Sequence, residues 1–170
     1  MEKDLKSKTL VQLERLVTGL GQPRYLAGYI FSAIQLHGAT DISAITTLSK
    51  SFRAKLVEEG CYISKLEIVD KLTDPDGTVK YIFGLPASTR LGEAGSDGNR
   101  IESVLLFDDD RRTLCVSTQA GCAMGCVFCA TGRLGLVRNL TAGEIVDQVN
   151  VAGGVSPKAD ARISNVVFMG

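Results

Sequence analysis

The sequence predicts an α/β protein, and three observations along its 170 residues support this prediction. Residues 7–60 carry apolar side chains at helical spacing between glycines, which is typical of short amphipathic helices. Residues 66–117 alternate between strand-forming runs and turn-forming residues, which indicates hairpins. From residue 112 to 169 a strand, a cysteine-rich loop, a helix and another strand follow one another. This order predicts a βαβ unit with parallel strands.

Three helices are predicted in the first part of the chain. The first ends at Gly19, and its apolar positions are Leu10, Leu13, Leu16 and Val17. The second begins near Pro23, which suits a first helical turn, and Gly38 is expected to cap its end. Its shared face is predicted to comprise Leu26, Tyr29, Ile30, Ala33 and Ile34. A third helix over 51–59 completes a small bundle, which predicts a helical accessory domain over residues 1–60.

Five strands are predicted after the helices, over residues 66–72, 79–85, 100–107, 112–117 and 163–169. Asp74-Pro-Asp-Gly77 between the first two is typical of a hairpin turn, and Asp108-Asp-Asp110 joins the next two. The small, glycine-rich stretch 87–99 is expected to be a mobile loop. Thr141-Ala-Gly-Glu144 has the pattern of a capping box and predicts a helix through about residue 152. The last strand is an apolar run, as expected of a buried parallel strand.

Composition gives little evidence about a partner. Nineteen basic and nineteen acidic side chains cancel, although residues 111–140 contain four arginines and no acid. That local bias suits a phosphate-bearing partner, and a solvated surface is the alternative. The first residues lack the apolar run of a signal peptide, and no stretch has the apolar length of a membrane span. Five cysteines, three of them clustered, favour a reducing compartment, so we expect a cytoplasmic protein without a membrane partner.

Three clustered cysteines carry most of the chemical information. Cys122, Cys126 and Cys129 are separated by three and then two residues, so one tight loop can aim three thiolates at one point. Soft thiolates suit an iron–sulfur cluster or zinc. Structural zinc takes four protein ligands, for which Cys115 is the candidate fourth, and a disulfide pair is a further alternative. A cubane cluster held by three cysteines leaves one iron open to a small molecule.

The spacing, the aromatic Phe128 before the last cysteine and the flanking glycines resemble the radical S-adenosylmethionine (SAM) superfamily. A longer set of segments is similar to the RNA adenosine methyltransferases of the RlmN/Cfr type. These segments are Thr113–Gly132, Gly135–Leu140, Gly143–Val149 and Asn165–Gly170. The resemblance runs from about residue 100 to the end and implies a 4Fe-4S cluster whose open iron chelates SAM. Reductive cleavage of SAM then yields a 5′-deoxyadenosyl radical, for which the protein supplies position and a dry site.

The resemblance also implies a substrate and a domain plan. Members of the C2-methylating branch methylate adenine C2 in 23S rRNA and tRNA, use SAM twice, and carry the methyl group on a cysteine expected to lie beyond this chain. An external electron donor of the reductase or flavodoxin type is implied. On this basis residues 61–107 are a β-hairpin linker region, and residues 108–170 begin a partial radical SAM (β/α)6-type barrel. The last strand would leave an unpaired edge, so we expect the N-terminal portion of a longer enzyme, inactive by itself.

The resemblance also implies roles for individual residues, which are assigned by their positions in the similar segments. The resemblance implies that Cys122, Cys126 and Cys129 bind the cluster, that Cys115 closes a transient disulfide, and that Glu102 is the proton acceptor. From pattern alone, Glu102 would be an outward charge on a half-exposed strand and Cys115 a small buried hydrophobe. Three other functions stay open. They are a C8-adenine methyltransferase, another radical SAM enzyme, and a non-catalytic iron–sulfur or zinc module that binds RNA.

The remaining candidates have simpler interpretations. Cys61 follows a helix-ending glycine and is expected to be a packed thiol, and Met124 is expected to pack beside the cluster. The third helix carries basic side chains that suit RNA phosphates or a solvated face, namely Lys50, Arg53 and Lys55.

Overall fold

The computed structural model describes residues 3–85, 100–108, 111–153 and 162–169, which form a mixed α/β structure of two compact units. The first unit comprises Met1–Lys65 and Ala142–Asn150, and the second comprises Leu66–Thr141 and Val151–Gly170. The loop expected over residues 87–99 lies outside the described residues. Among the described residues no helix has the length and apolar character that crossing a membrane requires. The domain ranges predicted from the sequence stay a prediction.

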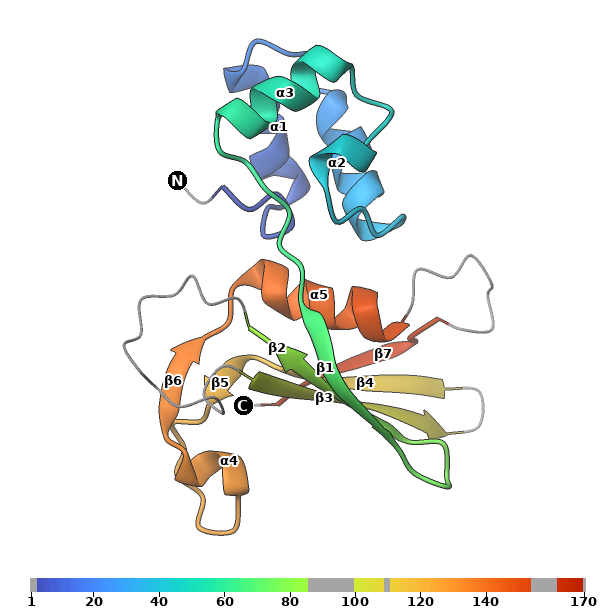
Figure 1. Cartoon of the computed structure of the whole chain (residues 1–170), viewed down its shortest axis with the longest axis vertical. Helices are drawn as coiled ribbons and strands as arrows, with labels where there is room; N and C mark the ends of the chain where they lie inside the picture. The colour runs from blue at the N-terminus through green and yellow to red at the C-terminus, as the bar shows by residue number, and fades with distance from the viewer. Residues whose placement is uncertain (1–2, 86–99, 109–110, 154–161, 170) are drawn as a thin grey trace. The chain divides into compact units, whose positions relative to one another are not determined.

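The first unit is helical (Figure 1), and its buried apolar side chains form one core. Its elements are α1 (Leu10–Gly19), α2 (Leu26–Gln35), the 3-10 helix η1 (Ile42–Ala44), α3 (Lys50–Glu58) and the first turns of α5 (Ala142–Gly153). The Thr9 side chain caps α1 by accepting a hydrogen bond from the Gln12 N–H, and Gln12 accepts one from the Thr9 N–H. Fully buried core side chains include Leu5, Leu13, Val17, Ile30, Ile34, Ile45 and Leu56.

The three predicted helices are confirmed, with differences at α2. Pro23 lies in a turn before the helix, where its carbonyl accepts a hydrogen bond from the Leu26 N–H, so the helix begins later than expected. Tyr29, predicted on the apolar face, is exposed instead, and its ring contacts that of Tyr25 edge-on. The buried face of α2 is formed by Ala27, Ile30 and Ile34. Tyr29 precedes Ile30 by one residue, and this step of about 100° along a helix turns its side chain toward water.

The second unit is built on a five-stranded sheet in the order β1-β2-β3-β4-β7 (Figure 1). The strands are β1 (Glu67–Thr73), β2 (Val79–Gly84), β3 (Arg100–Asp108), β4 (Arg111–Ser117) and β7 (Asn165–Met169). The first three pairings are antiparallel, so both predicted hairpins are confirmed, with Gly77 in the left-handed region at φ 89°. The β4–β7 pairing is parallel, and α5 lies between these strands in the chain, as expected of a βαβ unit.

The prediction that the last strand is buried is wrong for the residues of β7. Val166, Val167 and Phe168 are exposed, because β7 pairs only with β4 among the described strands and so forms an edge. Val166 and Phe168 pair with Leu114 and Val116, which are fully buried one strand further in. Apolar character predicted burial, but the position of a strand in the sheet decides how much of it is covered.

Candidate cysteine-loop site

The three clustered cysteines lie on a loop held at its base by a two-stranded ribbon that the sequence did not predict. This ribbon consists of β5 (Gln119–Gly121) and β6 (Leu136–Asn139), which pair antiparallel on either side of the loop and the short helix α4 (Ala130–Arg133). The backbone N–H of Cys122 donates to the Gly135 carbonyl at 2.9 Å. The cysteine loop was expected to follow β4 directly. Instead, β5 lies between them, and its pairing with β6 closes the base of the loop. A three-residue strand is too short to show a period-2 pattern.

Two glycines allow this closure. Gly121 has φ 71°, and a Cβ there would lie 1.9 Å from the Gly135 carbonyl oxygen, so no larger residue fits. Gly132 lies against the loop backbone, where a Cβ would approach the Cys126 nitrogen to 3.1 Å. Close backbone neighbours therefore explain why glycine stands at both positions.

Backbone groups and one arginine hold the loop between the cysteines. The Cys129 N–H donates to the Cys126 carbonyl at 3.0 Å, and the Met124 N–H donates to Cys122 Sγ at 3.5 Å. The Arg133 guanidinium donates to the Val127 carbonyl at 3.2 Å. Hydrogen bonds to sulfur tune the potential of iron–sulfur clusters. Sequence reasoning treated Arg133 only as part of a charge bias.

The loop supplies sulfur ligands alone, which suit an iron–sulfur cluster or zinc. Cys122 is buried, Cys126 and Cys129 are half-buried, and all three are free thiols. No three histidine, cysteine or acidic side chains in the described part of the chain are gathered closely enough to hold one metal ion. Cys115, the candidate fourth zinc ligand, lies within β4, paired with Val104 and Val167.

Three large apolar side chains lie between the cysteines in the sequence and are exposed. Met124, Val127 and Phe128 are 78%, 84% and 87% exposed. A run of exposed large apolar residues marks a surface that contacts something else. Met124, expected to pack beside a cluster, packs against nothing in the described structure that would bury it, although its place between two thiols suits that role.

Glu102 and Cys115 lie on one face of the large sheet, on the neighbouring strands β3 and β4. Val104 pairs with Cys115, so Glu102, two residues earlier, is a diagonal neighbour of Cys115 on the same face. The Ser117 hydroxyl donates to the Glu102 carbonyl at 2.7 Å. Because β5 lies beside β3, this face belongs to the same unit as the strand that leads into the cysteine loop.

The Glu102 carboxylate forms an ion pair that the sequence did not suggest. Lys80 Nζ, from β2, lies 2.8 Å from Glu102 Oε1, and the two side chains are 38% and 50% exposed. Lys80 is two residues from Ile82, which pairs with Glu102, so the diagonal rule for adjacent strands places the two charges together. The pairing of Lys80 with Glu102 could be predicted only once the register of β2 and β3 was known. The ion pair fixes the position of the carboxylate on the sheet face.

Known proteins resemble this chain over nearly its whole length. The dual-specificity RNA methyltransferase RlmN of Pelobacter propionicus is 44% identical over 167 residues, covering 98% of this chain and 44% of the relative. The same enzyme of Syntrophotalea carbinolica is 45% identical over 168 residues, covering 98% of this chain and 41% of the relative. The chain thus spans less than half the length of these relatives. No family model matches it.

A solved structure agrees with this result. The crystal structure of a radical SAM methyltransferase from Sphaerobacter thermophilus superposes on this chain with a TM-score of 0.79 at 38% sequence identity. The match covers 98% of this chain and 47% of that one. The shared fold therefore includes both the helical elements and the sheet with its cysteine loop.

Proposed function

We propose, from the premise that this chain belongs to the family of RlmN-type radical SAM RNA methyltransferases, that it is part of an enzyme that methylates adenine C2 in 23S rRNA and tRNA. The observation that carries the proposal is the closed cysteine loop, with three free thiols on one glycine-dependent turn. In this proposal the helical part is an accessory bundle and the sheet begins a (β/α)6-type barrel. The methyl-carrying cysteine is expected outside these 170 residues.

Cys122, Cys126 and Cys129 would hold a 4Fe-4S cluster with SAM at its open iron. When bound, these groups supply the adenosyl radical that the methylation of an unreactive ring carbon requires. The chain contributes position and shielding. Gly121 and the Cys122–Gly135 hydrogen bond fix the base of the loop. The apolar side chains around the thiols would keep water from the bound groups.

Glu102 and Cys115 would act on the sheet face beside the loop. Glu102 is proposed as the base that takes a proton from the methylated adenine adduct, and the ion pair with Lys80 orients its side chain. Cys115 is proposed as the thiol that attacks the sulfur of the methyl-carrying cysteine and forms a transient disulfide with it. The carbon–sulfur bond to the adduct breaks in this step, and its electron pair takes up a proton on the released methyl carbon. Cys115 is half-buried and free, as a resolving thiol must be. RNA and an external electron donor are the proposed partners, in the cytoplasm.

The proposal is tested with an RNA product assay on an enzyme that contains this chain within a full-length sequence. Expected products are 2-methyladenosine in 23S rRNA and tRNA, identified by mass spectrometry of nuclease digests. A Glu102→Gln variant should keep its iron content yet form no methylated RNA, whereas Asp70→Asn, on exposed β1, should leave the yield unchanged. Methylation at C8, or of no RNA at all, would replace the proposed reaction by one of its alternatives.

A further inference from the structure

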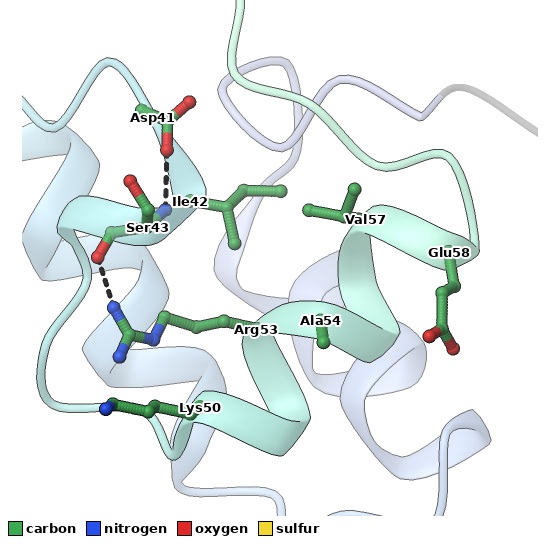
Figure 2. Close-up of a pocket in the computed structure, with 8 residues that line it drawn as sticks. All are labelled: Asp41, Ile42, Ser43, Lys50, Arg53, Ala54, Val57 and Glu58. Carbon is green, nitrogen blue, oxygen red and sulfur yellow. Dashed lines mark hydrogen bonds between the residues drawn. The ribbon is translucent and has the colours of Figure 1, made fainter.

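Some polar side chains link two elements by donating to a backbone carbonyl. In the helical unit the Arg53 guanidinium of α3 donates to the Ser43 carbonyl of η1, and the Ser43 N–H donates to Asp41 at 2.7 Å (Figure 2). In the other unit a serine makes such a link beside the proposed site. The Ser117 hydroxyl, at the end of β4, donates to the Glu102 carbonyl of β3 at 2.7 Å. This link therefore reaches the residue that is proposed as the base.

The Ser117 link lies where the backbone pairing of β3 and β4 ends. The last pair of the ladder between these strands is Val104 with Cys115. Ser117 is two residues further along β4 and Glu102 is two residues further back along β3, so in the same register the two face each other. The serine hydroxyl thus connects the strands at a level beyond the backbone ladder. Its loss would leave the two strands less firmly joined at Glu102.

The residue after Ser117 connects the same point to the base of the cysteine loop. The Thr118 hydroxyl and the Thr118 N–H both donate to the Met169 carbonyl, at 3.1 and 3.2 Å, which joins the end of β4 to β7. The Thr118 carbonyl accepts from the N–H of Leu140 at 2.9 Å, and Leu140 directly follows β6. Ser117 therefore extends from a backbone segment that is held on both sides. Its bond to Glu102 fixes the backbone of that residue relative to the base of the loop.

Ser117 also shares a sheet face with the proposed site residues. Successive side chains of a strand point to opposite faces, so Ser117 lies on the same face as Cys115, two residues earlier. Glu102 lies on this face as well, and its carboxylate is 2.8 Å from Lys80 Nζ of β2. The proposed base is thus held twice, at its backbone by β4 and at its carboxylate by β2. A general base acts within about 2.6–3.2 Å of the group whose proton it takes, so both contacts bear on its action.

We propose that Ser117 is a positioning residue, which holds Glu102 at the place from which it takes the proton of the adenine adduct. The inference rests on the proposed function and assigns Ser117 a role that acts through Glu102, without contact to the reacting atoms. Because a displacement of about 1 Å can cost about 100-fold in rate, losing one of two holds should slow the proton transfer about tenfold. Cleavage of SAM, which comes earlier, should not be slowed.

The first measurement needs no cluster or SAM and follows the Glu102 carbonyl by NMR. Labelling glutamate with ¹³C at the carbonyl and serine with ¹⁵N isolates one signal, because Glu102–Ser103 is the single glutamate–serine step in the 170 residues. Ser117→Ala should shift this signal, and Ser117→Thr, which keeps the hydroxyl, should restore it. Thr113→Val is the matched control and should leave the signal in place. It removes a hydroxyl from the same strand and face, one that accepts from Asn165 at 3.5 Å.

The second measurement is a single turnover of the full-length enzyme, in which SAM cleavage and RNA product are timed separately. Ser117→Ala should form 5′-deoxyadenosine at a rate within about twofold of the wild type but methylated RNA about tenfold more slowly, with RNA attached to the protein in the interval. Ser117→Thr should recover most of the product rate, and Thr113→Val should match the wild type.

Three results would overturn the role of Ser117. They are a product rate for Ser117→Ala equal to that of Thr113→Val, SAM cleavage slowed as much as product formation, and a Glu102 carbonyl signal that does not move. The second of these would show a merely structural residue. A wild type that cleaves SAM but methylates no RNA would overturn the proposed function itself, and the role of Ser117 with it.

Discussion

The helical unit and the unit that carries the cysteine loop differ in whether their charged or thiol side chains have partners within the unit. In the helical unit, Asp4, Lys6 and Asp147 are at most 3% exposed, and each has a partner inside the unit. Lys6 Nζ donates to Asp147 Oδ1 at 2.5 Å and to the Ser64 carbonyl at 2.6 Å. Asp4 Oδ1 accepts from the backbone N–H groups of Lys6 and Ser64. These buried, paired charges therefore stabilise the fold.

The cysteine loop shows the opposite arrangement. Its thiols are free, and the apolar side chains between them are more than three-quarters exposed at Met124, Val127 and Phe128. The backbone of the loop is nonetheless fixed, by the Cys122–Gly135 and Arg133–Val127 hydrogen bonds. A rigid backbone with unused side chains is what a binding loop requires, whereas a satisfied buried cluster stabilises one arrangement of the chain. The charged cluster of the helical unit is therefore structural, whereas the cysteine loop has the features of a binding site.

The largest effect is expected from removing one of the three thiols of the cysteine loop. Cys126→Ala should abolish binding of the cluster, because a loop with two thiolates cannot hold three irons of a cubane. Iron and sulfide content after anaerobic reconstitution measures this. Cys61→Ala is the control, since burial raises the pKa of this thiol and keeps it protonated in the helical unit. Equal iron content in the two variants would contradict the assignment of the loop as the site.

A large effect on stability is expected from breaking the buried ion pair. Lys6→Met leaves the Asp147 carboxylate buried without its ammonium partner, so the free energy of unfolding should fall by about 3–5 kcal/mol. The double variant Lys6→Met with Asp147→Leu should recover most of that loss. Urea unfolding followed by circular dichroism gives both values. Arg24→Met, which breaks the exposed pair with Glu14, should cost less than about 1 kcal/mol, and a similar cost for Lys6→Met would show that the cluster is not structural.

An intermediate effect is expected at the base of the loop. Gly121→Ala must move the Gly135 carbonyl or change φ, and backbone strain of this kind costs about 1–3 kcal/mol. The variant should take up less iron and melt at a lower temperature. Gly19→Ala is the matched control, because its Cβ meets nothing within 4 Å at the end of α1, and it should be neutral or stabilising. An unchanged melt and iron content for Gly121→Ala would mean that the loop is not rigid.

The smallest effect on stability is expected at the sheet face. Lys80→Met breaks a half-exposed ion pair with Glu102 and should change the free energy of unfolding by less than about 1 kcal/mol. Its consequence should instead appear as a lower yield of methylated RNA from a full-length enzyme, because the Glu102 carboxylate loses the ammonium group that orients it. Lys71→Met, on the exposed β1, should leave the yield unchanged. Equal yields from both variants would remove Lys80 from the site.

Much of the fold could be predicted from local patterns. Helical spacing and glycines located α1, α2 and α3, turn residues located both hairpins, and cysteine spacing located the loop. The buried pair of Lys6 and Asp147 could not be predicted, because its partners are 141 residues apart and either charge reads as surface. The apolar run of β7 predicted burial, whereas the unpaired edge also expected of this strand explains why Val166, Val167 and Phe168 are exposed. Tyr29 was misplaced by one step around a helix.

The site was predictable in its chemistry and less so in its geometry. The thiols follow from spacing, whereas β5, β6 and the Arg133 contact depend on pairings between residues on either side of the loop. Lys80 became visible only once the register of β2 and β3 was known. Sequence patterns identify the residues that carry out the chemistry. The tertiary structure decides which neighbouring side chains contact them.

The most direct measurement is electron paramagnetic resonance of the reconstituted, reduced protein before and after addition of SAM. If three thiolates leave an iron corner for this ligand, SAM should change the spectrum of the cluster, and SAM labelled with ¹⁷O or ¹⁵N at the amino acid group should show hyperfine coupling to the iron. A protein that binds zinc in place of iron, or a cluster whose spectrum is unaltered by SAM, would contradict the account.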